Sequence, residues 1–128
     1  MDAPSGILFE EESYAIRGAV FEVYSHLGAG FAEPVYQEAL EMELALRGIP
    51  FEAQKQIRIA YKGKALSQTY RADILCFGKI VLELKSVRAL PPEHEAQLLN
   101  YLKAGPFRLG FLINFSHVPA VDIRRYIN

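Results

Sequence analysis

The residues best suited to chemistry in this sequence are Asp73, Glu83 and Lys85, which lie in two mostly apolar segments joined by a short turn. If the turn closes a hairpin, the two carboxylates lie directly opposite each other. Like charges in that position destabilise a pair of strands. A cation between them would remove the repulsion, and a divalent metal ion is the first candidate. Glu83 and Lys85 are two residues apart and therefore share a face of their strand.

The register of this hairpin follows from the turn Phe77-Gly78-Lys79, a three-residue loop that contains glycine. Such a loop pairs Cys76 with Ile80. Counting away from the turn along both strands then brings Asp73 opposite Glu83.

The composition indicates one globular domain over residues 1–128, of which residues 1–9 form a loose lead-in. The chain is 51% hydrophobic and 23% charged, which is ordinary for a soluble domain. No apolar run is long enough to cross a membrane, and residues 1–12 lack the pattern of a signal peptide, so we expect a cytoplasmic protein without a membrane partner. Cys76 is the only cysteine, which excludes an internal disulfide and a cysteine-rich zinc site.

Charge is distributed unevenly along the chain. Residues 1–54 hold ten acidic and two basic side chains, residues 55–88 hold two and eight, and residues 89–128 hold three and four. The two acidic residues in the basic segment are Asp73 and Glu83. That pattern suits a phosphate-rich substrate beside a metal ion. Solvated strand faces that aid solubility would explain the basic residues equally well, and both interpretations stay open.

The periodicity of apolar residues predicts the element order ααβββαβ, followed by a segment that could add an edge strand. A three-strand meander followed by a crossover helix and a further strand indicates a mixed sheet with helices packed on it, an α/β (α+β) fold. The second strand should bend near Ser67-Gln68. The expected helices cover residues 11–27, 34–47 and 92–103, and the expected strands cover residues 55–61, 65–76, 80–85 and 108–115, with an edge strand within 117–128.

Four motifs in this order resemble those of the PD-(D/E)XK nuclease superfamily. The first resembles the GxxExxY pattern of a small bacterial family within it, the second the acid and Glu-x-Lys signature, the third the Gln-x-x-x-Tyr helix of RecB-like members, and the fourth the last core strand. In this chain they are Gly30-Phe31-Ala32-Glu33-Pro34-Val35-Tyr36, Asp73 with Glu83-Leu84-Lys85, Gln97 to Tyr101, and Leu112-Ile113-Asn114-Phe115.

The resemblance implies a restriction-endonuclease-like core with a mixed sheet of four to five strands, and a metal-dependent nuclease. Mg²⁺ or Mn²⁺ would be held by Asp73 and Glu83, with Glu33 as a third carboxylate and the backbone carbonyl of Leu84 as a further oxygen. Lys85 would orient the attacking water or stabilise charge on the phosphate. The substrate would be a nucleic acid, with DNA the first choice.

Gln97, Tyr101 and Tyr36 would support the site or contact the nucleic acid. The sequence departs from the family pattern at Ala72, where the superfamily name has proline, and at Ser116, where glycine is expected. Neither departure removes a chemical group. We expect no separate recognition domain in a chain of this size, and a compact core of this kind often acts as a homodimer or with a partner protein.

Two alternatives remain at this stage. The chain could be a non-catalytic module that keeps the nuclease fold and binds nucleic acid or protein. Lys85 could also form a structural ion pair with Asp73 or Glu83. An intact set of Asp73, Glu83, Lys85 and Glu33 favours catalysis, because a site that has lost its catalytic activity is expected to lose at least one of these residues.

Overall fold

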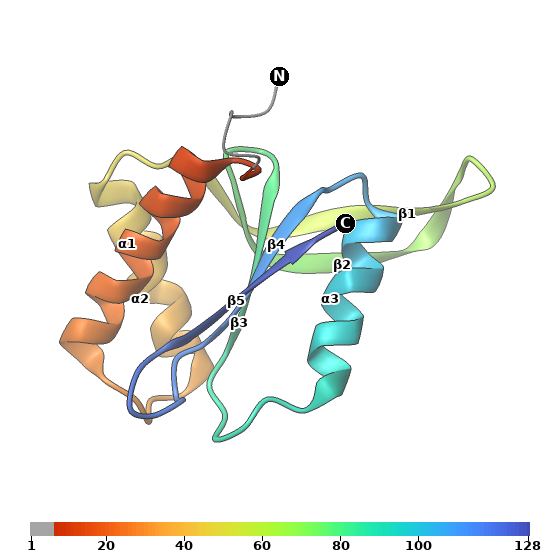
Figure 1. Cartoon of the computed structure of the whole chain (residues 1–128). Helices are drawn as coiled ribbons and strands as arrows, with labels where there is room; N and C mark the ends of the chain where they lie inside the picture. The colour runs from red at the N-terminus through yellow and green to blue at the C-terminus, as the bar shows by residue number, and fades with distance from the viewer. Residues whose placement is uncertain (1–6) are drawn as a thin grey trace.

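The computed structural model describes residues 7–128, which form a five-stranded sheet with helices on both faces (Figure 1). The strands lie in the order β1-β2-β3-β4-β5, and only β3 and β4 are parallel neighbours. The elements are α1 (Glu10–Leu27), α2 (Glu33–Leu46), β1 (Phe51–Tyr61), β2 (Lys64–Cys76), β3 (Ile80–Lys85), α3 (Pro92–Ala104), β4 (Leu109–Asn114) and β5 (Asp122–Ile127).

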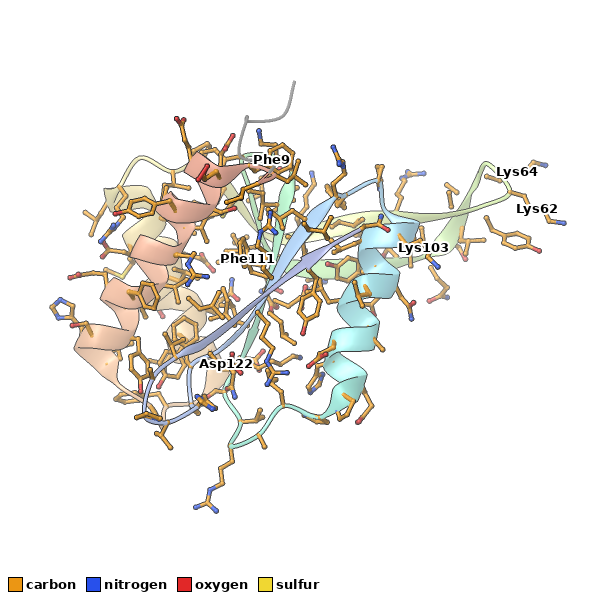
Figure 2. All side chains as sticks on the ribbon, in the orientation of Figure 1. Phe9, Lys62, Lys64, Lys103, Phe111 and Asp122 are labelled. Atoms are coloured by element: carbon orange, nitrogen blue, oxygen red, sulfur yellow. The ribbon has the colours of Figure 1, made fainter. Side chains whose placement is uncertain are left out.

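Two apolar clusters hold the layers together. Helices α1 and α2 cover one face of the sheet and α3 covers the other (Figure 1). The first cluster includes Tyr36 of α2 and Phe111 of β4, whose side chain is labelled in Figure 2. The second joins Leu98 and Leu102 of α3 to Val81 of β3. The expected mixed sheet flanked by helices is confirmed.

The helix and strand bounds differ from the expectation mainly at element starts. Strand β1 begins at Phe51, four residues before the expected start, and α2 begins at Glu33 with Pro34 in its first turn, where proline is well tolerated. The expected edge strand is present as β5. Leu8 is buried, so the chain is packed from this residue on, while residues 1–6 of the expected lead-in lie outside the described part. None of the helices formed by residues 7–128 is long and apolar enough to span a membrane.

The central hairpin has the register expected from its turn. Cys76 pairs with Ile80, and the Lys79 N–H donates to the Cys76 carbonyl at 3.0 Å. The ladder between β2 and β3 ends at the pair Ile74–Leu82, one position before Asp73 would meet its partner. The short ladder leaves an opening between the two strands.

The expected bend near Ser67-Gln68 is also present. Arg58 pairs with Thr69, but the next pair toward the hairpin tip joins Ala60 to Ala65, so β2 carries extra residues at this point. Such a bulge twists a strand and redirects its side chains.

A second irregularity lies at Asp73 itself. Ala72 is packed in the α3 cluster and Ile74 in the cluster beneath α1 and α2, although residues two apart normally share a face. Gln54, opposite Asp73 on β1, has a left-handed φ of 52°, and the β1–β2 register passes over this pair. Both strands therefore change face at the position of Asp73.

We expect Gly110→Val to destabilise the protein by about 1–3 kcal/mol. Gly110 lies under α3, and an added Cβ would come within 3.2 Å of side-chain atoms of Leu98 and Leu102. Urea unfolding measures the loss, and the exposed strand substitution Ala60→Val should change the free energy of unfolding by less than about 0.5 kcal/mol. Equal stability of Gly110→Val and wild type would contradict the close packing of α3 on β4.

Candidate active site

The opening between β2 and β3 is filled by the carboxylate of Asp73. Its Oδ2 accepts a hydrogen bond from the Leu84 N–H at 2.7 Å. If the ladder continued, Leu84 would pair with Ala72 of β2. The side chain of Asp73 thus replaces a backbone acceptor, and it remains in the space where the strands separate.

Glu83 makes the reciprocal contact. Its Oε1 accepts hydrogen bonds from the Asp73 N–H at 3.4 Å and from the Tyr70 hydroxyl at 3.3 Å. Each carboxylate is therefore held by a backbone N–H of the opposite strand. This confirms the expectation that the two acids face each other across the hairpin.

The protein environment disfavours ionisation of both carboxyl groups, Asp73 and Glu83. Burial raises the pKa of Asp73, against the opposing effect of the Leu84 N–H. Burial also raises the pKa of Glu83 to about 8, and the charge of Asp73 adds to the rise. Because the two groups interact strongly, they titrate as a pair. Without a cation, the pair keeps a proton near neutral pH.

Lys85 lies close to the acids without neutralising either of them. Its charge lowers the pKa of Asp73, Glu83 and Glu33. Among residues 7–128, however, Lys85 takes part in no ion pair within 4.0 Å. The alternative of a simple structural ion pair is therefore not what the structure contains.

Glu33 lies further from the other two acids. It is partly buried at the start of α2, and burial raises its pKa, with a further rise caused by Asp73. Within the described residues, no three His, Cys, Asp or Glu side chains are close enough together to hold a metal ion. The structure thus assembles the pair Asp73 and Glu83, and Glu33 at the start of α2 interacts with Asp73 and Lys85 through its charge alone.

The backbone carbonyl of Leu84 adds an oxygen on the side of the opening between β2 and β3. The Lys85 carbonyl accepts a hydrogen bond from Phe115 N–H, so it points toward the chain that follows β4. Backbone groups alternate in direction along a strand, which turns the Leu84 carbonyl toward β2 and the opening. Two carboxylates and a carbonyl are the hard oxygen ligands that Mg²⁺ and Mn²⁺ prefer, so this donor set fits such an ion.

The loop before Glu33 is held by Tyr36. This side chain is fully buried and stacked on Phe115, with ring centroids 4.5 Å apart. Its hydroxyl donates to the Gly28 carbonyl and accepts from the Phe31 N–H at 3.2 Å. Tyr36 therefore positions the helix start, and because its side chain is not exposed it fits the first of the two roles predicted for it, support of the site, and not contact with nucleic acid.

The departure at Ser116 has a structural use. Its Oγ accepts from the Gly30 N–H at 3.2 Å and lies 2.6 Å from Ser86 Oγ, which donates to the Phe31 carbonyl. These bonds tie together the loops that follow α1, β3 and β4. Gly30 itself has a φ of 108°, a conformation that favours glycine.

The predicted Gln97 and Tyr101 act on the site through a third residue. Gln97 Nε2 donates to the Tyr101 hydroxyl at 2.9 Å, and the Tyr101 ring stacks on Tyr70 at a centroid distance of 3.6 Å. Tyr70 in turn donates to Glu83. The arrangement links α3 to the Glu83 carboxylate.

Three polar residues at the site escaped the sequence analysis. Besides Tyr70, Gln37 of α2 donates to the Asp73 carbonyl at 3.0 Å, and a hydrogen bond from Gln54 lowers the pKa of the Asp73 carboxyl. Regular strand alternation would place Tyr70 and Asp73 on opposite faces, so no simple pattern marks Tyr70. Nothing in the sequence marks the two glutamines.

Comparison with known proteins identifies the family. The model of the PD-(D/E)XK nuclease superfamily matches residues 10–126. The chain belongs to this superfamily. The crystal structure of SSO0001 is similar to it with a TM-score of 0.58 and 18% sequence identity, covering 91% of this chain and 77% of that one. Comparison with the curated proteins gives no significant match. The expected restriction-endonuclease-like fold is confirmed, and nucleases of this superfamily generally use divalent metals.

We expect the metal-free protein to lose stability as the pH rises from about 5 to 8. Glu83 has a pKa of about 8 in the folded protein against 4.5 normally, so only the folded state keeps its proton in this window. The free energy of unfolding should fall by an amount on the order of 2 kcal/mol. Urea unfolding in EDTA at several pH values measures it.

The variant Glu83→Gln should flatten this pH dependence, because glutamine has no proton to release. Glu38→Gln, which removes an exposed carboxylate of α2, should keep the wild-type slope. A slope that is unchanged in Glu83→Gln would show that burial of this carboxyl does not control the behaviour.

Proposed function

We propose that this protein is a divalent-metal-dependent nuclease that hydrolyses phosphodiester bonds in DNA. The observation that carries the proposal is the pair Asp73 and Glu83, partly buried side by side and left without an ion pair by Lys85. Neighbouring carboxyl groups whose pKa values are raised by burial and by each other's charge are typical of functional sites. Membership of the nuclease superfamily supplies the reaction class.

Asp73, Glu83 and the Leu84 carbonyl would hold Mg²⁺ or Mn²⁺ directly. Glu33 would bind through a water molecule, since Mg²⁺ usually keeps several waters of its own. When bound, the ion polarises the scissile phosphate and lowers the pKa of the attacking water.

The protein's own groups then have separate roles. The Leu84 N–H and the Asp73 N–H keep the two carboxylates in place, and Tyr70 orients Glu83. The Lys85 ammonium would donate to the attacking water or to a phosphate oxygen, where negative charge develops. Gln97 and Tyr101 support the arrangement from α3.

The pattern Gly30, Glu33 and Tyr36 supports assignment to the GxxExxY group within the superfamily. Each residue has a task that its type explains. Gly30 adopts a positive φ, Tyr36 closes the loop with its hydroxyl, and Glu33 is thereby held at the start of α2, facing Lys85 and Asp73.

The test is cleavage of plasmid and linear DNA with Mn²⁺, with Mg²⁺ or with EDTA. We expect metal-dependent cleavage by the wild type. Asp73→Asn, Glu83→Gln and Lys85→Met should each lower the rate by at least about 100-fold, since the two carboxylates would hold the metal ion and the Lys85 ammonium would stabilise charge on the reacting phosphate. Lys103→Met removes an exposed lysine of α3 and serves as the control, with a rate close to wild type.

Calorimetry with Mn²⁺ separates binding from catalysis. The wild type and Lys85→Met should bind the ion, while Asp73→Asn and Glu83→Gln should bind it much more weakly. Cleavage that survives all three site variants would refute the site. A wild type that neither cleaves nor binds Mn²⁺ would indicate the non-catalytic binding module instead.

A further inference from the structure

The hairpin of β1 and β2 projects well beyond the rest of the sheet (Figure 1). We call residues 55–71 the arm. At a rise of about 3.3 Å per residue, β2 extends roughly 26 Å from Arg71 to the turn at Gly63. The arm contains no acidic residue and five basic ones, Lys55, Arg58, Lys62, Lys64 and Arg71.

Most of the arm's cations have no partner within the fold. Arg58, Lys64 and Arg71 form no ion pair with any residue of the described chain, and Lys62 only places its ammonium 5.5 Å from the centre of the adjacent Tyr61 ring. Elsewhere the basic side chains Arg47, Lys79 and Arg124 are paired with acids. The arm's charge is therefore available to an outside anion.

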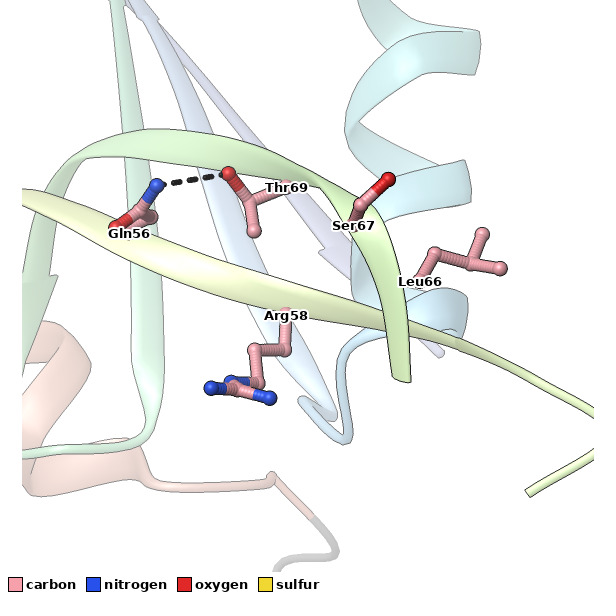
Figure 3. Close-up of a pocket in the computed structure, with 5 residues that line it drawn as sticks. All are labelled: Gln56, Arg58, Leu66, Ser67 and Thr69. Carbon is pink, nitrogen blue, oxygen red and sulfur yellow. Dashed lines mark hydrogen bonds between the residues drawn. The ribbon is translucent and has the colours of Figure 1, made fainter. Parts of the chain in front are cut away.

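One face of the arm is polar and basic. Ile57 and Tyr70 pack toward α3, whereas the cross-strand pairs Gln56–Arg71 and Arg58–Thr69 alternate with them on the other face. A hollow on this part of the hairpin is lined by Gln56, Arg58, Leu66, Ser67 and Thr69 (Figure 3). Gln56 Nε2 donates to Thr69 Oγ1 there at 3.0 Å. Arginines with amides and hydroxyls are typical donors to phosphate oxygens.

The arm leads directly into the candidate site. Strand β2 carries Arg71 two residues before Asp73, and Tyr70 at the base of the arm contacts Glu83. At the other end, Lys62 and Lys64 lie at the hairpin tip (Figure 2). An anionic chain that follows the arm would thus reach the two carboxylates.

We propose that the arm binds the phosphate backbone of a nucleic-acid duplex and guides it to Asp73 and Glu83. The inference rests on the proposed nuclease function. A two-stranded ribbon has the dimensions of an element that enters a major groove. A single-stranded partner would instead call for a series of aromatic side chains to stack its bases. Tyr61 is the only exposed aromatic residue of the arm.

The test is fluorescence anisotropy with a 30-base-pair DNA duplex and its separated strands, in EDTA over a series of salt concentrations. We expect Arg58→Gln/Arg71→Gln and Lys62→Gln/Lys64→Gln each to weaken duplex binding about 10-fold. The slope of log affinity against log salt should fall by roughly 0.9 for each lost phosphate contact. Thermal melting checks that these variants remain folded.

Two controls separate a specific surface from general charge. Arg17→Gln/Arg108→Gln removes the same charge from α1 and from the residue that precedes β4 and should bind as the wild type does. Arg58→Lys/Arg71→Lys keeps the charge and should retain most of the affinity. Equal losses in arm and control variants, or no loss in either arm variant, would overturn the proposal.

Other outcomes are equally decisive. Tighter binding of single strands than of the duplex would overturn the choice of partner. Because the measurement needs neither metal nor cleavage, it is independent of the nuclease proposal. If the wild type never cleaves DNA but binds the duplex through the arm, the nuclease proposal is refuted and the proposed role of the arm stands. If the protein cleaves DNA but the arm variants bind the duplex as the wild type does, only the proposed role of the arm is refuted.

Discussion

The hydrogen bond from the Leu84 N–H to the Asp73 carboxylate is the contact on which the central part of the molecule depends. It appears where a backbone carbonyl would continue the ladder, and it lets β2 leave β3 without an unsatisfied donor. The separation of the strands makes room for Glu83, and the change of face at Asp73 sends the rest of β2 away from the sheet core. One side chain thus ends a ladder, lines the site and starts the arm.

The same contact concentrates negative charge where it is costly. Two carboxyls with raised pKa values, a nearby lysine outside ion-pair distance, and a left-handed residue at Gln54 all lie around one position. None of these features helps a sheet to fold. Local departures from what favours stability are common at functional sites, where a ligand compensates for them. The remaining packing, with two apolar clusters on opposite faces, is ordinary and tolerates this local cost.

The sequence predicted the elements that depend on local signals. The glycine turn set the hairpin register, the apolar periodicity set the helices, and Ser67-Gln68 marked the bulge. It also identified Asp73, Glu83 and Lys85, because charges in apolar strands stand out. It could not foresee the face change at Asp73, since strand alternation assumes a regular ladder. For the same reason the contribution of Gln54 was hidden, and the separation of Glu33 from the acid pair depends on how α2 docks, which no local pattern encodes.

Gly110 lies away from the reacting groups, yet its packing affects the position of a side chain in the site. Its missing side chain lets Leu98 and Leu102 settle against β4, which fixes the height of α3 above the sheet. At that height the Tyr101 ring meets Tyr70 face to face, and Tyr70 meets Glu83. A hydrogen atom in place of a side chain, on a strand that contributes no predicted ligand, therefore acts as the spacer that sets the position of a carboxylate on the neighbouring strand.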